Sequence, residues 1–382
     1  MEYRELPKLN IKTSILGFGG MRFPKLEDGE IDEATAIKMV RYAKDNGVNY
    51  FDTAYIYHSG KSEGLYKKAL APYPRDSYFL ADKLAVWLIN SKDDAEKMFN
   101  EQLERCGVDY FDFYLLHSLD SDYWKNHVLK YDLVNFCLRK KAEGKIKNLG
   151  FSFHDSRRLF GTILRYAKWD FCQIQYNYMD TKIQAGESGY KYAKKMGIPM
   201  VIMEPVKGGL LAKLPNDVVL PFKQLDKDAS FASYALRYVA VHDNVKVILS
   251  GMSTMEQVED NVKTFSTFKP LLAKEKNAIK QVKENLTKRV RVGCTGCEYC
   301  MPCPSNVSIP DNFSVWNEYG MYENKKRAIQ QWNNNISDKE KAKNCINCGR
   351  CETLCPQHIK IPDMLKLLQK EMDELNLHNN ND

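Results

Sequence analysis

Eight of the eleven cysteines lie in two short runs near the C-terminus. The first run has two residues between successive thiols, and the second has gaps of two, two and three residues. A proline directly follows each run. The runs are Cys294, Cys297, Cys300 and Cys303, then Cys345, Cys348, Cys351 and Cys355. The chain begins with a polar stretch of mixed charge that is no secretory signal, so reduced thiols and metal binding are expected rather than disulfides.

The second run has the spacing that bacterial ferredoxins use for cubane iron–sulfur clusters, in which the fourth cysteine serves the other cluster. We therefore predict two 4Fe-4S clusters with crosswise ligands. Cluster one takes Cys294, Cys297, Cys300 and Cys355, and cluster two takes Cys345, Cys348, Cys351 and Cys303. The alternatives are a single cluster, or structural zinc held by four thiolates.

Upstream of the cysteines, short apolar runs alternate with helical patterns to about residue 265. This alternation indicates parallel strands covered by helices. A count of eight favours a closed (β/α)8 TIM barrel in the α/β class, with an open doubly wound sheet as the alternative. The expected strands are Thr13–Gly17, Asn49–Thr53, Tyr78–Asp82, Phe111–His117, Ile146–Ser152, Phe171–Gln175, Met200–Glu204 and Val245–Leu249.

Helices are expected between these strands, and two of them carry sequence signals for their first turn. Ser91 followed by Asp94, and Thr254 followed by Gln257, fit capping boxes. The expected helices include Asp32–Asp45, Ser91–Arg105, Asp132–Ala142 and Phe231–Val241.

A charged helical stretch, Leu271–Leu286, leads into the cysteine region. We therefore predict a barrel domain over residues 1–285 and a mostly helical, ferredoxin-like domain with two clusters over residues 286–382. Helical runs are expected around Asp311–Trp332, and the terminal HNNND is expected to fray. The net charge of +7 arises largely from Leu271–Gly293, which argues against a nucleic-acid face.

Polar side chains stand at the ends of three neighbouring strands, where the chemistry of such a barrel lies. Asp52 ends the second strand, Lys83 follows the third, and His117 ends the fourth, with Tyr57 just past the second. Carbonyl reduction needs a proton at the developing oxyanion, and a phenol is a weak acid at neutral pH. An ammonium from Lys83, held by Asp52, would lower the pKa of the Tyr57 phenol. His117 would orient the substrate oxygen.

The chain resembles the aldo-keto reductase superfamily over about residues 10 to 264. The stretches that carry the likeness occur in order along the chain. They are LGFGGMRFP, YFDTAYIYHSGKSE, ADKL, DYFDFYLLH, KIKNLGFSFH, CQIQYNYMD, EPVKGGLL and ILSGMSTMEQVEDNV. By this resemblance the catalytic tetrad is Asp52, Tyr57, Lys83 and His117, Tyr57 is the proton donor, and a nicotinamide (NADP or NAD) lies across the barrel mouth.

The resemblance also implies the cofactor-binding residues. Ser152 and Gln175 would hold the carboxamide, and Glu204 with Pro205 would line the cleft. The loop and helix after the last strand would take the phosphates and the adenosine end, because helix N-termini favour anions. The residues implied there are Ser250, Gly251, Ser253, Thr254, Gln257 and Asn261.

The sequence departs from the family pattern at several positions. Phe153 follows Ser152 where the family often has Asn, and Asp82 precedes Lys83 where Thr is frequent. Gly251 and Gln257 stand where many NADPH-specific members have Lys and Arg, so NAD and NADP both remain open. The loop after Tyr57 is long and adds His58, expected either against substrate or, more simply, facing solvent.

Two hypotheses follow. The first is a cytoplasmic oxidoreductase that reduces an aldehyde, ketone or quinone, whose clusters transfer electrons or stabilise the fold. The second is an iron–sulfur electron-transfer protein whose barrel docks partners. The C-terminal region resembles the dicluster ferredoxin-like domain of one branch of aldo-keto reductases. The candidate redox partner is a ferredoxin or flavodoxin-type protein, and no membrane span is expected because no apolar run is long enough.

Overall fold

The computed structural model describes residues 1–379, which form two compact units. The first unit consists of Met1–Ala212 and Ser230–Lys276, and the second consists of Lys213–Ala229 and the chain from Asn277 onward. The segment Lys213–Ala229 thus groups with the C-terminal unit, which the sequence did not indicate. The domain boundary predicted near residue 285 stays a prediction. The last three residues of the terminal HNNND lie outside the described residues.

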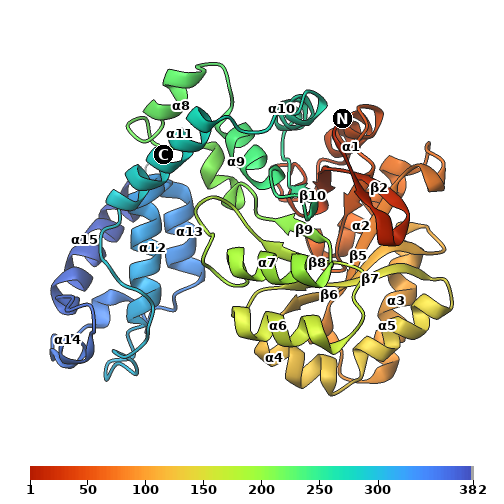
Figure 1. Ribbon diagram of the computed structural model, residues 1–382. Helices are drawn as coiled ribbons and strands as arrows, with labels where there is room; N and C mark the ends of the chain where they lie inside the picture. Colours follow the sequence, from red (N-terminus) through yellow and green to blue (C-terminus); the bar gives the residue numbers. More distant parts are fainter. Residues whose placement is uncertain (380–382) are drawn as a thin grey trace. The chain divides into compact units, whose positions relative to one another are not determined.

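The first unit is built on a closed barrel of eight parallel strands, which confirms the predicted (β/α)8 architecture and excludes the open sheet (Figure 1). The strands follow one another around the barrel in chain order, and β10 closes it against β3. They are β3 (Leu16–Gly19), β4 (Tyr50–Asp52), β5 (Phe79–Leu84), β6 (Phe111–Leu119), β7 (Ile146–Phe153), β8 (Cys172–Gln175), β9 (Met200–Met203) and β10 (Val245–Ser250).

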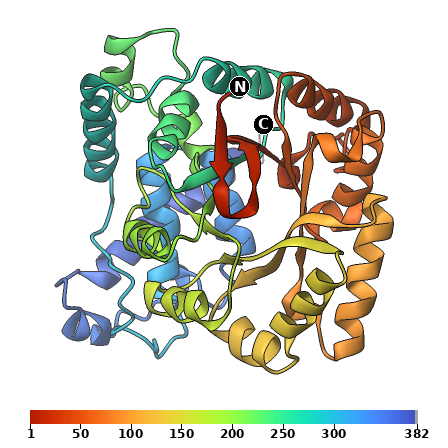
Figure 2. The same cartoon turned by 45° about the vertical axis from the view of Figure 1, so that its right-hand side comes forward.

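A hairpin precedes the barrel and corrects the first expected strand. The predicted Thr13–Gly17 spans the end of β2 (Ile11–Ser14) and the start of β3, because the apolar run continues through the turn between them. Strand β2 pairs antiparallel with β1 (Tyr3–Leu6), and Figure 2 shows this hairpin in red. Thr13 Oγ1 donates to the Lys246 carbonyl at the start of β10, so the hairpin lies at the N-terminal ends of the strands.

The helices cover the outside of the barrel, and the capping signals hold in part. Ser91 and Asp94 form the predicted capping box of α3. Thr254 caps α10 through the Gln257 N–H, but the Gln257 side chain accepts from Ser253 instead. The helices are α1 (Glu33–Asp45), α2 (Lys61–Leu70), α3 (Lys92–Cys106), α4 (Ser121–Tyr123), α5 (Leu133–Ala142), α6 (Arg157–Tyr166), α7 (Gly186–Met196), α9 (Phe231–Ala240) and α10 (Met255–Ser266).

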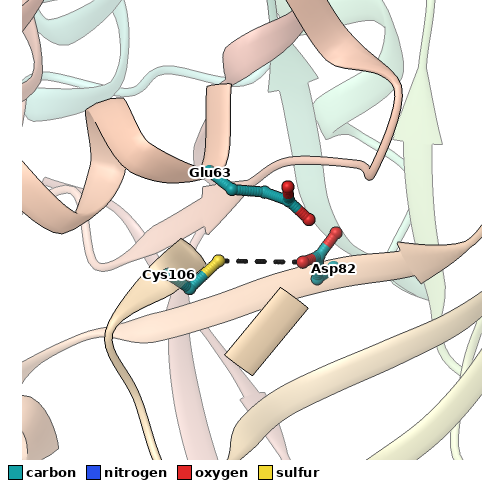
Figure 3. A group of neighbouring side chains, drawn as sticks. All are labelled: Glu63, Asp82 and Cys106. Carbon is teal, nitrogen blue, oxygen red and sulfur yellow. Dashed lines mark hydrogen bonds between the residues drawn. The ribbon is translucent and has the colours of Figure 1, made fainter. Parts of the chain in front are cut away.

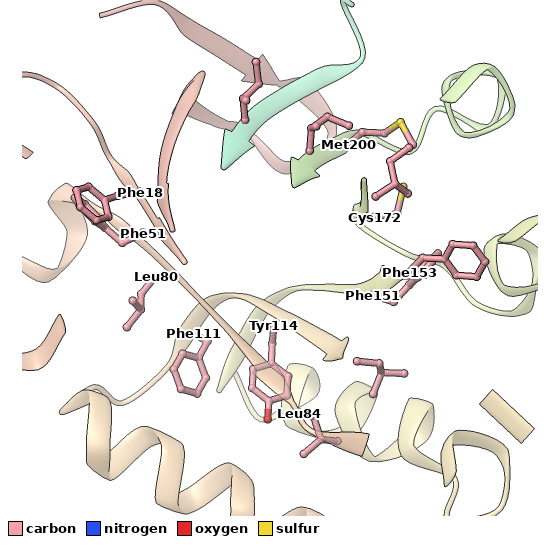
Figure 4. Close-up of a cluster of buried hydrophobic side chains, with 14 of the residues drawn as sticks. Phe18, Phe51, Leu80, Leu84, Phe111, Tyr114, Phe151, Phe153, Cys172 and Met200 are labelled. Atoms are coloured by element: carbon pink, nitrogen blue, oxygen red, sulfur yellow. The ribbon is translucent and has the colours of Figure 1, made fainter. Parts of the chain in front are cut away.

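Side chains alternate between the two faces of each strand, and this sets up two apolar regions. Inside the barrel, Tyr50, Phe113 and Phe171 pack together with five smaller residues. The opposite faces carry the larger shell beneath the helices, and Figure 4 labels part of it, from Phe18 and Phe51 through Tyr114 to Met200. The alternation therefore decides which polar side chains enter the barrel mouth.

The second unit is helical over its described residues and has its own core. Its apolar residues include Phe313, Trp316, Trp332 and Leu368, and six of the eight run cysteines pack on or within this core. The helices are α8 (Leu220–Leu225), α11 (Ala273–Lys288, which begins in the first unit), α12 (Ile309–Tyr322), α13 (Lys325–Asn334), α14 (Arg350–Leu354) and α15 (Ile361–Asn379). Helices α12 and α13 confirm the helical runs expected there.

Within the described part of the chain, every helix is too short or too polar to cross a lipid bilayer.

Candidate active site and metal centres

The structure brings the four predicted tetrad residues together at the C-terminal end of the barrel. Asp52 is the last residue of β4, Lys83 lies on β5 and His117 on β6. Each comes two residues after a residue of the inner core (Tyr50, Ala81 and Leu115), so all three side chains lie on the inner face and enter the barrel. Tyr57 begins the short 3-10 turn that follows β4, Tyr57–Gly60.

Lys83 and Asp52 form a buried ion pair. Lys83 Nζ donates to Asp52 Oδ1 at 2.6 Å and also to the Thr53 carbonyl, and the Lys83 residue is 0% exposed. Burial is the largest single influence and would lower the pKa of Lys83, but Asp52, Tyr57 and Asp82 together outweigh it and the net pKa is raised. Burial likewise raises the pKa of Asp52, opposed by Lys83. Lys83 is therefore a permanent ammonium.

Tyr57 lies directly against that ammonium. Lys83 Nζ is 4.9 Å from the centroid of the Tyr57 ring. Burial raises the pKa of Tyr57, and Lys83 opposes the rise. Lys83 therefore acts on this pKa in the predicted direction, but the loss of water around the phenol is the larger effect, so the net pKa is raised in the protein alone.

The backbone after Tyr57 is held in an unusual conformation. His58 and Ser59 have φ values of 51° and 56°, in the left-handed region that such residues rarely adopt. His58 does not face solvent as expected, since its Nε2 accepts from the Phe23 N–H at 3.2 Å and its ring packs on Phe23. The long loop is therefore tied to the chain after β3.

His117 is a neutral imidazole beside Tyr57 and the Lys83–Asp52 ion pair. Burial and the nearby Lys83 charge hold the pKa of His117 well below its ordinary value, and its Nδ1 is buried without a partner. Its ring lies 6.0 Å from that of Tyr57 and 5.1 Å from that of Trp87. Trp87 in turn stacks on Tyr123. The sequence analysis missed this aromatic wall, because Trp87 and Tyr123 come from short helical turns after two different strands.

Ser152 and Gln175 lie at the ends of β7 and β8, and both side chains already have partners. Ser152 Oγ accepts from the Ser118 N–H at 2.7 Å, which fixes the strand end beside His117. Gln175 Nε2 donates to Asp180 at 3.0 Å. Phe153, the residue after Ser152, points to the outer shell in Figure 4, so it has no access to the barrel mouth.

A cleft of about 820 Å³ opens beside the last strands of the barrel. Most of the predicted cofactor residues line it: Glu204, Pro205, Ser250, Gly251, Ser253, Gln257 and Asn261. Arg22 also lines it, with Arg22 Nη2 3.7 Å from Glu204 Oε1. The sequence analysis missed Arg22, although it stands in the quoted stretch LGFGGMRFP.

Hydrogen bonds fix the loop between β10 and α10 to α10 and to the chain after β3. Asn261 Nδ2 donates to Ser250 Oγ at 3.0 Å, and Ser253 Oγ donates to the Arg22 carbonyl at 2.8 Å. Thr254 is the N-cap of α10. A helix N-terminus and an arginine on one cleft suit an anionic group such as the phosphates of a dinucleotide, so the residues present fit the expected cofactor.

The eight run cysteines gather around two small cavities in the second unit. Cys294, Cys297, Cys300 and Cys355 line one of about 320 Å³. Cys303, Cys345, Cys348 and Cys351 line the other, of about 360 Å³, together with Cys300. The fourth cysteine of each run thus reaches the cavity of the other run, as the crosswise prediction requires. Four thiols around one cavity fit a cubane cluster.

Comparison with known proteins agrees with this geometry. Residues 15–284 match the Aldo/keto reductase family, and residues 293–360 match a 4Fe-4S dicluster domain. The chain therefore belongs to the aldo/keto reductase family and carries in addition a C-terminal 4Fe-4S dicluster domain.

Two relatives illustrate the match along the chain. L-galactose dehydrogenase of Arabidopsis thaliana is 27% identical over 321 residues, covering 75% of this chain and 97% of that protein. The NADH-specific methylglyoxal reductase of Escherichia coli (strain K12) is 24% identical over 278 residues, covering 62% of this chain and 84% of that protein.

Two solved structures match about three quarters of this chain. The holo form of the aldo-keto reductase AKR11C1 from Bacillus halodurans superposes with a TM-score of 0.62 at 26% identity, covering 74% of this chain and 96% of that one. A Klebsiella pneumoniae aldo-keto reductase in complex with NADPH gives 0.61 at 19% identity over 74% of this chain and 96% of that one, which supports the fold.

Proposed function

We propose that this oxidoreductase reduces the carbonyl of an aldehyde, ketone or quinone with NADPH or NADH, and that Tyr57 is the proton donor. The observation that carries the proposal is the buried Lys83 ammonium, which is 2.6 Å from Asp52 on one side and faces the Tyr57 ring at 4.9 Å on the other. A reduced nicotinamide, when bound, supplies the hydride.

Each side chain has a distinct task in this proposal. The Tyr57 hydroxyl gives its proton to the carbonyl oxygen as negative charge develops there. The Lys83 ammonium stabilises the phenolate that remains, and Asp52 keeps Lys83 charged and in place. Neutral His117 donates a hydrogen bond to the substrate oxygen and so orients it.

The cofactor residues are proposed as those lining the cleft, with Arg22 added to the set. Arg22 is a candidate partner for a phosphate of the dinucleotide, because Arg offers a planar fork of donors. Ser152 and Gln175 are proposed to bind the nicotinamide carboxamide, which would compete with the hydrogen-bond partners that the two side chains have now. Thr254 acts through the cap of α10. The choice between NAD and NADP is left to measurement.

In the second unit we propose two 4Fe-4S clusters with the crosswise ligands. A bound cluster passes one electron at a time, whereas the barrel chemistry moves two. The clusters therefore serve either a one-electron partner such as a ferredoxin or flavodoxin, or the stability of their unit. The cytoplasm keeps thiols reduced and so free to bind a cluster, and it is the location we propose.

Replacing Tyr57 tests the function. The iron-loaded protein is assayed for NADPH and NADH oxidation with a panel of aldehydes, ketones and quinones. We expect Tyr57→Phe to lower turnover about 10²- to 10⁴-fold, because general acid catalysis contributes that much. Tyr55→Phe is the matched control, since Tyr55 lies two residues away and bonds to Glu101. Turnover in Tyr57→Phe equal to that in Tyr55→Phe would dismiss the tetrad.

A further inference from the structure

Two acidic side chains and a thiol meet in the protein interior just behind the Lys83 strand (Figure 3). Glu63 comes from α2, Asp82 from β5 and Cys106 from the end of α3. Glu63 and Asp82 are both 0% exposed, and one ligand atom of each of the three residues lies within 4.8 Å of the others. Asp82 precedes Lys83 and therefore points to the opposite face of the strand.

The hydrogen bonds around the acids leave one oxygen without a donor. Asp82 Oδ1 accepts from the Lys83 N–H at 2.8 Å, and Cys106 Sγ is 3.7 Å from Asp82 Oδ2. Glu63 Oε2 accepts from Arg105 Nη1 at 3.1 Å. Glu63 Oε1 is buried and receives no N–H or hydroxyl donor. Carboxyl oxygens of Glu63 and Asp82 lie within 4.8 Å of each other, and Figure 3 shows the two carboxyl groups facing one another.

Too little positive charge faces this pair for both acids to be ionised. The Lys83 ammonium is paired with Asp52 on the inner face of the strand. Arg105 is shared with Glu101 and is itself partly exposed. The groups that face the pair are Lys83 on β5, Gln102, Arg105 and Cys106 on α3, and Tyr114 on β6. Two neighbouring carboxylates in a dry interior repel strongly, and sharing one proton removes the repulsion.

We propose that Glu63 and Asp82 share one proton, with Asp82 the protonated partner, and that this pair positions Lys83. Asp82 then donates to Glu63, which supplies the missing partner of Glu63 Oε1, while the Glu63 carboxylate stays paired with Arg105. The direction agrees with the surroundings. Burial and then the Glu63 charge raise the pKa of Asp82 well above its ordinary range.

The pair acts on Lys83 through its backbone and through charge. The Lys83 N–H is held by Asp82, and its carbonyl accepts from Gln102 Nε2 at 3.1 Å. Because Asp82 is neutral, Asp52 is the one charged carboxylate beside the Lys83 ammonium. An ionised Asp82 would raise the pKa of Tyr57 further. The shared proton therefore keeps the phenol a better acid. This link rests on the proposed function, whereas the proton itself does not.

The proton can be observed directly, without any assay of activity. In the infrared difference spectrum of wild type minus Asp82→Asn at neutral pH, we expect the carbonyl stretch of a protonated carboxyl group, shifted in D₂O. If Asp82→Asn does not fold, the same difference spectrum is recorded with Glu63→Gln, in which Asp82 should lose its proton. Absence of the band from the difference spectrum overturns the proposal. Zinc found by metal analysis in the wild type and lost in the variant would also overturn it, because Glu63, Asp82 and Cys106 would then be metal ligands.

The effect on Lys83 is tested by the pH profile of kcat/KM. With Gln at position 63 the amide can donate to Asp82, which then ionises. We expect Glu63→Gln to move the basic limb upward by about one pH unit. The double variant Glu63→Gln with Asp82→Asn should return it to the wild-type position. Glu101→Gln is the matched control, since it also removes a carboxylate from Arg105. A limb that does not move in Glu63→Gln overturns the positioning role.

Discussion

The charged groups of the barrel site are buried, whereas most thiols of the cysteine unit are at least partly exposed to water. Lys83 is 0% and Asp52 2% exposed. Of the eight run cysteines, all of which the structure describes, Cys351 alone is buried, and Cys297 and Cys348 are exposed. Lys83 and Asp52 are paired with each other at hydrogen-bond distance, while the run thiols line two cavities.

The difference teaches that the two sites depend on different sources of order. The barrel site is organised by the fold itself, since a buried ammonium and carboxylate are stable only as a pair. The thiol sites are completed by what they bind, because ligand thiols must lose their protons and the metal supplies the opposing charge. Removing one member of the buried ion pair should therefore lower the stability of the barrel, and removing a cysteine ligand should lower the iron content.

The largest expected effect is on iron. Cys303→Ala should abolish cluster two and halve the iron and sulfide per chain, because Cys303 lines the cavity of the second run. Adding Cys345→Ala should cost no more iron, since both residues serve the same cluster. Iron and sulfide analysis after anaerobic purification checks this. If the double variant loses all of its iron, the ligands are not crosswise and each run holds its own cluster.

The next effect is on the stability of the barrel. Lys83→Met leaves the Asp52 carboxylate buried without its partner, which should lower the free energy of unfolding by about 3–5 kcal/mol. Lys61→Met is the matched control, because Lys61 pairs with Glu30 at an exposed position worth less than about 1 kcal/mol. Denaturant unfolding of the two variants measures the difference. A loss in Lys83→Met no larger than in Lys61→Met would mean that the buried pair does not organise the site.

The same contrast explains how much could be predicted from sequence. The cysteine ligands lie in contiguous runs whose spacing is fixed by the cluster, so the spacing alone indicates the site. The barrel strands could be predicted because their apolar runs are local. The strand ends then indicate Asp52, Lys83 and His117 as candidates, and the structure brings them together, although their roles remain predictions.

The rest depends on contacts between distant parts of the chain. The Glu63–Asp82 contact joins a helix to a strand, and nothing in either segment indicates that the two acids meet. Arg22 reaches the cleft because the chain after β3 lies beside the loop after β10, as the Ser253–Arg22 bond shows. The grouping of Lys213–Ala229 with the second unit is likewise a property of tertiary packing, which periodicity does not encode.

The smallest expected effect sharpens the comparison through pH. His117 has a pKa in the folded barrel well below the ordinary value of about 6.5. At a pH between the folded and the unfolded pKa, this histidine is protonated in the unfolded chain and neutral in the folded barrel. Stability should therefore fall as the pH drops below about 6.5, by up to about 1.4 kcal/mol per pH unit for this one group.

His117→Asn removes that proton from the balance, and its stability should fall less steeply with decreasing pH than that of the wild type. Denaturant unfolding of both proteins between about pH 5 and pH 7 measures the two slopes. Equal slopes would mean that His117 is protonated as readily in the folded barrel as in the unfolded chain. The imidazole would then carry a charge beside the Lys83 ammonium, and the barrel mouth would not be the dry site that distinguishes it from the cysteine unit.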